Sequence, residues 1–418
     1  MLTMLKKQYL WEISHVFRYR TFRLFWLGQF ISVIGDSLIP ITVSFAIIDL
    51  SGSATDIGIV LGSLWGARIL FILLGGVWSD RLPRRLVMIG SDLARAINHG
   101  VVAFTFFTDI IQVWHLALSS ALYGAASAFF APASSGIIPE LVPKEYLRQA
   151  NAIISISNSI VMLFGPALAG FLVQLIGYGP IFAFDALTFI ISALFLLSLR
   201  LPESVAYIGK QTFFTDVKYG FREVTKHQWI WVTSLATSLT NVAVASFYIL
   251  GPIVINQKLG GSVDWGLIMT SSSIGGILGG ILSHRFFPSR PFIPAFIIMG
   301  LSISMEIFSL IPPIPLWGLM TFAALTSAST VLTSVFWDTL VQQHVSADVL
   351  SRVNSLDSLI SFVFMPLGFI VSGPLADKIG LNSTLYLMIS LALIPSLGVL
   401  LVPAVRNLRS IEGKTENM

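Results

Sequence analysis

The chain has 418 residues, of which 55% are hydrophobic and only 11% are charged. A soluble domain carries about 25% charged residues, so this chain has too little charge to cover a water-soluble surface and is predicted to be an integral membrane protein. The net charge of +4 is too small to indicate a nucleic-acid partner, and the absence of cysteine excludes disulfides and thiolate metal sites.

Twelve apolar stretches approach the roughly 20 residues that a helix needs to cross the hydrocarbon. Lipid offers the backbone no hydrogen bonds, so all twelve are predicted to be helices. They cover residues 24–48, 57–77, 87–107, 111–132, 151–176, 180–199, 230–252, 265–286, 292–311, 315–337, 354–375 and 382–403. The predicted fold class is an all-α membrane protein with twelve transmembrane helices in two six-helix halves.

The basic residues predict the orientation of these spans. If the N-terminus is cytoplasmic, all but four of the 25 Lys and Arg residues fall in cytoplasmic segments, the four being Arg68, Arg95, Lys258 and Lys378. Both termini are therefore predicted to be cytoplasmic. The predicted segments are an N-terminal segment (1–23), a first bundle (24–199), a cytoplasmic linker (200–229), a second bundle (230–403) and a C-terminal tail (404–418).

The two halves resemble each other in sequence. "VPKEYLRQAN" (142–151) aligns with "VSADVLSRVN" (345–354) at an offset of 203, and each segment precedes the fifth span of its half. At the same offset Gly165 and Gly170 fall opposite Gly368 and Gly373. Six plus six spans with internal similarity is typical of a transporter whose binding site lies between the repeats near the membrane midplane.

The tightest charge cluster lies between the second and third spans, in "GGVWSDRLPRRLVM" (75–88). Its pattern resembles the signature loop of the major facilitator superfamily, G-x-x-x-D-R-x-G-R-R, with Pro83 where a second glycine is common. Its matching residues are Gly76, Asp80, Arg81, Arg84 and Arg85. The resemblance implies the twelve-helix fold of that family, a multi-pass plasma-membrane location and a small-molecule substrate.

Other stretches resemble the branch of the family that contains macrolide-efflux proteins and the enterobactin exporter. They include "WLGQFISVIGDSL", "SDLARA" and "FDALTFIISAL". "GPALAG" resembles part of the span-five element of antiporters and predicts a helix bend or break at Gly165, Pro166 and Gly170. The span-four stretch "SALYG" lacks the arginine that drug–proton antiporters of the family often carry, which leaves the coupling ion open.

The family resemblance implies that the 75–88 loop is a cytoplasmic gate, whose ion pairs form in one state and break in another. The alternative is a turn that sets topology and whose charges are simply solvated. That alternative is strongest for Arg84. The equivalent stretch of the second half, "GGILSHRFFPSR", has His284 in place of the aspartate, so only the first half keeps the full pattern.

Charged residues within spans are costly and are therefore functional candidates. Asp36, in span one, could bind a cationic substrate or carry the coupling proton, and a pair with Arg68 would lower the cost of both charges. Asp92 and Arg95 are three residues apart and are expected to pair with each other in a structural or gating role. Glu306 is a candidate for proton handling or for helix packing. Asp185, in "FDAL", is expected to pin span six.

Polar residues on the spans that line the cavity in the family could contact a substrate. The candidates are Ser32, Tyr123, Asn241, Thr326, Thr330 and Thr333. The alternative is that the hydroxyls bond to the backbone of their own helices. Aromatic and acidic lining together would suit bulky amphiphilic cations.

No nucleotide-binding, zinc-protease or serine-hydrolase motif occurs in the chain, so no enzyme activity, catalytic residue, cofactor or metal is predicted. Energy must then come from a gradient. The predicted function is proton-coupled efflux of small amphiphilic compounds, drug-like or macrolide-like, by a monomer in the lipid bilayer. The alternatives are a dedicated siderophore or lysophospholipid transporter of the same superfamily and, from another class, a transport-inactive membrane sensor or scaffold.

Overall fold

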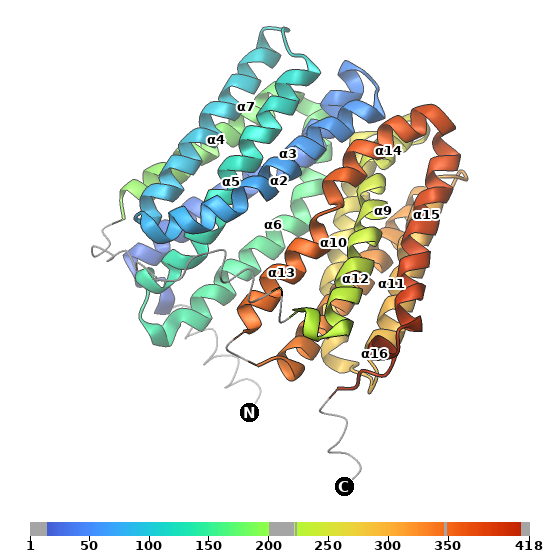
Figure 1. Ribbon diagram of the computed structural model, residues 1–418. Coiled ribbons are helices and arrows are strands. Elements are labelled where there is room, and N and C mark those ends of the chain that lie inside the picture. Colours follow the sequence, from blue (N-terminus) through green and yellow to red (C-terminus); the bar gives the residue numbers. More distant parts are fainter. Residues whose placement is uncertain (1–14, 200–220, 222–223, 347–348, 411–418) are drawn as a thin grey trace, which may run out of the picture. The chain divides into compact units, whose positions relative to one another are not determined.

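The computed structural model of the chain describes residues 15–199, 221, 224–346 and 349–410, and every regular element among them is a helix (Figure 1). The first half contains α2 (Arg20–Leu50), α3 (Ala54–Arg81), α4 (Arg84–Phe107), α5 (Val113–Leu141), α6 (Leu147–Ile176) and α7 (Tyr178–Leu197). The second half contains α9 (Gln228–Lys258), α10 (Ser262–Arg285), α11 (Phe292–Phe308), α12 (Leu316–His344), α13 (Leu350–Phe362), α14 (Met365–Ile379), α15 (Leu381–Gly398) and the short α16 (Pro403–Arg406).

Each predicted span coincides with a helix, and the eleventh is divided into α13 and α14. Within the described residues, ten helical segments are long and apolar enough to cross a membrane. The two predicted spans outside these ten segments are α4, which carries Asp92, Arg95 and His99 in its middle, and α11, which has 17 residues. The count of twelve spans and the cytoplasmic location of both termini therefore remain predictions.

The helices group into two compact units. One comprises residues 1–51 and 63–209, and the other comprises residues 52–62 and 210–418. The start of α3 belongs to the second unit because Gly58 and Gly62 pack directly against Phe369 and Ile370 of α14. The predicted linker, 200–229, falls largely outside the described residues, so the predicted domain boundaries stay predictions.

The same packing pattern occurs in each unit. In the first unit, α2 packs against α6 and α7, and α4 packs against α5 and α7. In the second unit, α9 packs against α14 and α15, and α11 packs against α12 and α15. The first helix of each half thus packs against the fifth and sixth helices, and the third packs against the fourth and sixth, as an internal repeat requires.

Glycines 203 residues apart in the sequence have the same structural role in the two units. Gly165 brings α6 against Ser37 of α2, and Gly368 brings α14 against Val242 of α9. Gly177 ends α6 with φ at 75°, and its counterpart at the same offset, Gly380, ends α14 with φ at 87°. An L side chain rarely adopts that left-handed conformation, so both turns into the sixth helix of a half depend on glycine.

Proline acts differently at Pro83 and at Pro166. Pro83 forms the N-cap of α4, and α3 continues to Arg81, so the predicted loop shrinks to Leu82 and Pro83. By contrast, α6 runs through Pro166 without interruption, so a helix break there is wrong, and the predicted bend stays a prediction. Proline removes a single backbone donor, and a membrane helix can continue past that loss. A break does occur in the eleventh span, immediately before Pro366 at the start of α14.

Candidate functional site

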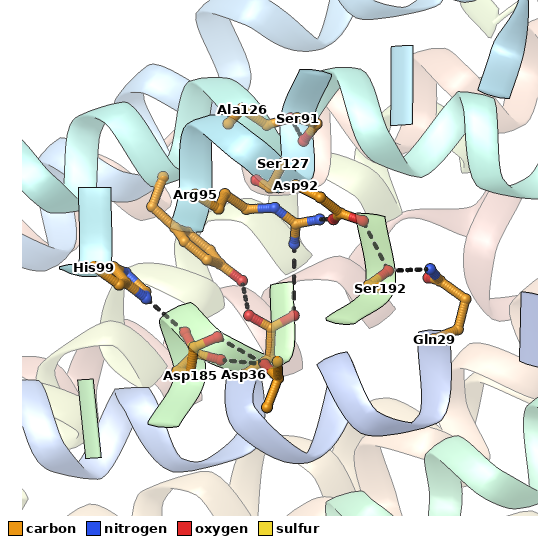
Figure 2. Close-up of polar contacts among 12 residues, drawn as sticks. Gln29, Asp36, Ser91, Asp92, Arg95, His99, Ala126, Ser127, Asp185 and Ser192 are labelled. Atoms are coloured by element: carbon orange, nitrogen blue, oxygen red, sulfur yellow. Dashed lines mark hydrogen bonds and ion pairs between the residues drawn. The ribbon is translucent and has the colours of Figure 1, made fainter. Parts of the chain in front are cut away.

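The first unit contains a buried network of charged and polar side chains from α2, α4, α5 and α7 (Figure 2). Its central residues, Asp92, Arg95 and His99, lie on one face of α4, because positions three and seven residues apart share a helix face. All three are almost fully buried, at 0%, 3% and 2% exposure. Burial of that much charge requires partners, and the neighbouring helices provide them.

Arg95 lies between two carboxylates. Its Nη2 is 2.5 Å from Asp92 Oδ1, and its Nη1 is 3.6 Å from Asp36 Oδ2. The predicted Asp92–Arg95 pair is therefore confirmed. The predicted Asp36–Arg68 pair is wrong, because the long Arg95 side chain reaches from α4 to α2 and occupies the place beside Asp36. The short loop between spans one and two does not fix which face of α3 turns toward Asp36.

Aromatic rings complete the surroundings of the guanidinium. The Arg95 guanidinium carbon is 4.2 Å from the centroid of the Phe189 ring and 4.4 Å from that of Phe130. Cation–π contacts of this kind stabilise a desolvated cation. They matter here because Arg95 Nε is buried without a hydrogen-bond partner.

Tyr123, on α5, links Asp36 to a second pair of charges. Its hydroxyl donates a hydrogen bond of 2.7 Å to Asp36 Oδ1. Its ring stacks on the His99 imidazole, with centroids 5.3 Å apart and planes 3° from parallel. Tyr123 therefore holds the Asp36 carboxylate on one side and contacts the histidine on the other.

His99 and Asp185 form the second pair, with His99 Nδ1 2.5 Å from Asp185 Oδ2. Asp185 is fully buried, and the Thr188 hydroxyl lies 3.3 Å from its Oδ1. Gly35 of α2 packs directly against the Asp185 carboxylate, which places Asp185 next to the turn that carries Asp36. The predicted pinning of span six thus has a specific partner, a histidine.

Sequence reasoning missed His99, although a signal was present. His99 lies four residues after Arg95 and seven after Asp92, so all three share one face of a single span. A polar face across two turns of a membrane helix indicates a buried network. The Ser192–Gln29 link was missed as well: the Ser192 hydroxyl donates to Asp92 Oδ2 at 2.7 Å and accepts from the Gln29 amide at 3.1 Å.

Arg68 lies apart from this network. It is half-buried near the middle of α3, and its guanidinium carbon is 5.4 Å from the centroid of the Trp65 ring. Among the described residues, no carboxylate lies within ion-pair distance of it.

The predicted gate residues divide into two groups. The surroundings of Gly76 and the side chains of Asp80 and Arg81, on the last turns of α3, lie outside the described part of the structure, so their predicted gate role stays a prediction. Arg84 Nη1 donates to the Gly136 carbonyl at 2.6 Å and to Glu140 Oε1 at 3.0 Å. Arg84 is thus bound to α5, so the alternative of a simply solvated charge is wrong for Arg84.

Arg85 binds the C-terminal end of α7. It donates from Nε to the Leu196 carbonyl at 2.8 Å and from Nη2 to the Leu197 carbonyl at 2.7 Å. The last carbonyls of a helix have no partner within the helix, and a cation is favoured there. Arg85 therefore caps α7.

In the second unit, the Glu306 carboxyl group on α11 lies beside the Thr326 hydroxyl on α12. Glu306, on α11, is 7% exposed and forms no ion pair with any described residue. The Asn241 amide donates to the Ser361 carbonyl at 2.9 Å. Thr330 and Thr333 donate to carbonyls of their own helix, which is the predicted alternative to substrate contact. The Thr326 side chain is buried, and Ser32, in the first unit, is buried on α2.

Known proteins share both sequence and fold with this chain. A family model described as Major Facilitator Superfamily matches residues 25–368. Macrolide efflux protein A of Streptococcus pyogenes is 25% identical over 401 residues, covering 94% of this chain and 98% of the relative. The multidrug efflux pump Tap of Mycolicibacterium fortuitum is 25% identical, covering 90% and 93% of the two chains. The enterobactin exporter EntS of Salmonella typhi is 25% identical, covering 84% of each.

Two solved structures have a similar fold. The nucleoside transporter NupG matches with a TM-score of 0.74 at 16% identity, covering 91% of this chain and 98% of that chain. A bacterial homologue of the human lysosomal transporter Spinster, inward-facing and unoccupied, matches with a TM-score of 0.71 at 17% identity, covering 93% and 97%. At these identities the likeness shows the fold alone.

Proposed function

Because this chain belongs to the Major Facilitator Superfamily, we propose that it exports small amphiphilic compounds across the plasma membrane in exchange for protons. Proteins of this family are transporters and not enzymes, and this chain is a multi-pass plasma-membrane protein. The proposal adds a direction, a substrate class and a coupling ion to that premise.

The observation that carries the proposal is the charge count around Arg95. Two carboxylates, Asp36 and Asp92, share one guanidinium. With both ionised, the group has one excess negative charge, which is costly inside a membrane. A proton on one carboxylate removes that excess without leaving Arg95 unpaired. The network is thus built to hold and release one proton.

Exposure indicates which carboxylate takes the proton. The Asp36 side chain is 24% exposed, whereas the Asp92 side chain is fully buried. Asp36 is also the more distant partner of Arg95, at 3.6 Å against 2.5 Å. A proton therefore reaches Asp36 more easily and disrupts a weaker contact there. Asp92 remains the fixed counter-ion of Arg95 throughout.

Protonation of Asp36 then changes the contacts between helices. A neutral Asp36 no longer attracts Arg95, so α2 loses an ionic contact with α4, while Tyr123 can still bond the carboxyl group. A transporter needs states of similar energy that one bound ion can reorder. In this proposal, release of the Asp36 proton on the cytoplasmic side follows substrate export and restores the ion pair.

The direction and the substrate class are inferred from the relatives. Proteins that are 25% identical over most of their length are a macrolide efflux protein and a multidrug efflux pump. A relative that exports enterobactin supports a second candidate, a dedicated siderophore exporter. Export of several unrelated dyes favours the first candidate, and export of a siderophore alone favours the second.

The test is efflux of a panel of fluorescent amphiphiles from cells that express wild type or Asp36→Asn, with and without a protonophore. We expect the wild type to export at least one dye, and both the protonophore and Asp36→Asn to abolish that export. The matched control is Asp109→Asn, which makes the same change at an exposed turn residue with φ at 56°, a conformation that Asn tolerates. Normal export by Asp36→Asn would assign Asp36 a structural role and end this proposal for it.

A further inference from the structure

Arg68 is the one described charge near the middle of a first-unit span that has no ionic partner. Asp36, Asp92, Arg95 and Asp185 all lie in the network, within ion-pair distance of an oppositely charged group or a histidine. Among the described side chains, the Arg68 guanidinium lies over the Trp65 ring, with its carbon 5.4 Å from the ring centroid. An isolated cation at this depth costs about 2.5–3.5 kcal/mol or more, so its retention requires a compensating partner.

The depth of Arg68 excludes the lipid headgroups as that partner. Thirteen or more residues of α3 lie on either side of Arg68, which is about 20 Å of helix in each direction at 1.5 Å per residue. The hydrocarbon core is about 30 Å thick, so Arg68 lies near its centre. A phosphate at either surface is beyond the reach of its side chain.

The packing of α3 places Arg68 beside a neighbouring helix. Gly124 of α5 lies directly against the Leu64 carbonyl and the Arg68 backbone nitrogen. The Arg68 side chain is half-buried beside the half-buried Trp65.

We propose that Arg68 and Trp65 bind an anionic group, such as a carboxylate, sulfonate or phosphate, on an aromatic compound that the protein exports. This inference rests on the proposed export function and names its substrate class. A guanidinium matches the geometry of such anions with paired donors, and an indole adds a surface on which an aromatic ring can stack. The alternative, a cation bound at Asp36, is weakened because Arg95 and Tyr123 already occupy that carboxylate.

The experiment uses two dyes that share one xanthene ring system, one with a free carboxylate and the other its methyl ester. Export of both is measured from cells that express wild type, Arg68→Gln or Arg406→Gln. Arg406 is an exposed residue in α16, so it provides the same substitution outside the spans. We expect Arg68→Gln to lower the ratio of acid export to ester export about tenfold, the size of one lost charged hydrogen bond, and Arg406→Gln to leave it unchanged.

An unchanged ratio in a normally expressed Arg68→Gln protein overturns the inference. If that variant does not reach the membrane, binding of the two dyes to purified wild type decides: preference for the acid supports the inference, and equal binding overturns it. The same experiment tests the proposed proton coupling independently of the anion site. Export that resists a protonophore refutes proton exchange, while an acid preference that depends on Arg68 would still support the anion site. If wild type exports neither dye, broad export loses its support and the binding measurement alone judges Arg68.

Discussion

Gly136 of α5 lies directly beneath the Arg84 guanidinium. A Cβ atom on that glycine would lie 2.6 Å from Arg84 Nε and 2.9 Å from its Cζ. The absence of a side chain at this position is what allows Arg84 to reach both the Gly136 carbonyl and the Glu140 carboxylate. A glycine in one helix is therefore needed for a charged contact made by another.

The substitution Gly136→Ala is expected to displace Arg84 and to lower the stability of the protein by about 1 kcal/mol, because it breaks a half-exposed ion pair and its accompanying hydrogen bond. Thermal unfolding in detergent measures the effect. The control is Gly90→Ala in α4, where a Cβ meets nothing within 4 Å and alanine favours the helix by about 0.5–1 kcal/mol. Equal stability of the two variants would contradict the contact.

The substitution Tyr123→Phe keeps the ring that stacks on His99 and removes only the hydroxyl that donates to Asp36. A hydrogen bond to a charged group contributes about 1.5–3 kcal/mol, so we expect coupled export to fall about tenfold while the folded protein is retained. The measurement is dye export driven by an imposed proton gradient in proteoliposomes. Tyr386→Phe, at an exposed position of α15, is the matched control. Wild-type export by Tyr123→Phe would show that Asp36 does not depend on this donor.

The buried His99–Asp185 pair should behave as a unit. His99→Leu and Asp185→Leu each leave one buried polar partner unsatisfied, and each is expected to destabilise the protein by about 1–3 kcal/mol. The double variant removes both polar groups and leaves neither unsatisfied, so its loss should be smaller than the sum by about 1–3 kcal/mol. A double-mutant cycle of unfolding free energies measures this difference, and strict additivity would argue against the pair.

The two repeated glycines should be equally intolerant of a side chain. Gly165→Ala places a methyl group against Ser37, the residue after Asp36, and Gly368→Ala places one against Val242. Overpacking of this kind costs about 1–3 kcal/mol, and we expect both variants to lose thermal stability in detergent. Gly398→Ala, which meets nothing within 4 Å, is the control. A loss in only one of the two would mean that the repeated positions do not share one role.

Contacts within one helix could be predicted from the sequence, whereas contacts between helices could not. The Asp92–Arg95 pair follows from a spacing of three residues, which any helix places on one face. The partner of Asp36 depends on how α2, α4 and α7 are rotated about their axes, and spacing does not contain that rotation. The sequence therefore favours Arg68, on the adjacent span, over Arg95.

Partners that are backbone atoms have no signature in the sequence. Arg84 and Arg85 bind carbonyls of Gly136, Leu196 and Leu197, and any residue provides a carbonyl. The resemblance of the 75–88 loop to a family pattern predicted a gate with ion pairs, which stays a prediction, and did not predict these bonds to backbone carbonyls. The bounds of the spans were more accessible, because long apolar stretches in lipid have few conformations other than helix.

The cap on α7 also has a consequence for synthesis of the chain. Arg85 and Leu196 are 111 residues apart, and ribosomes add about 5–20 residues per second. Arg85 must therefore wait several seconds for its acceptors, until the sixth helix has entered the membrane. This contact can form only when the first half of the chain has been synthesised, before the second half has been translated. The hydrogen bonds of Arg85 are therefore among the last contacts to form within the first six helices.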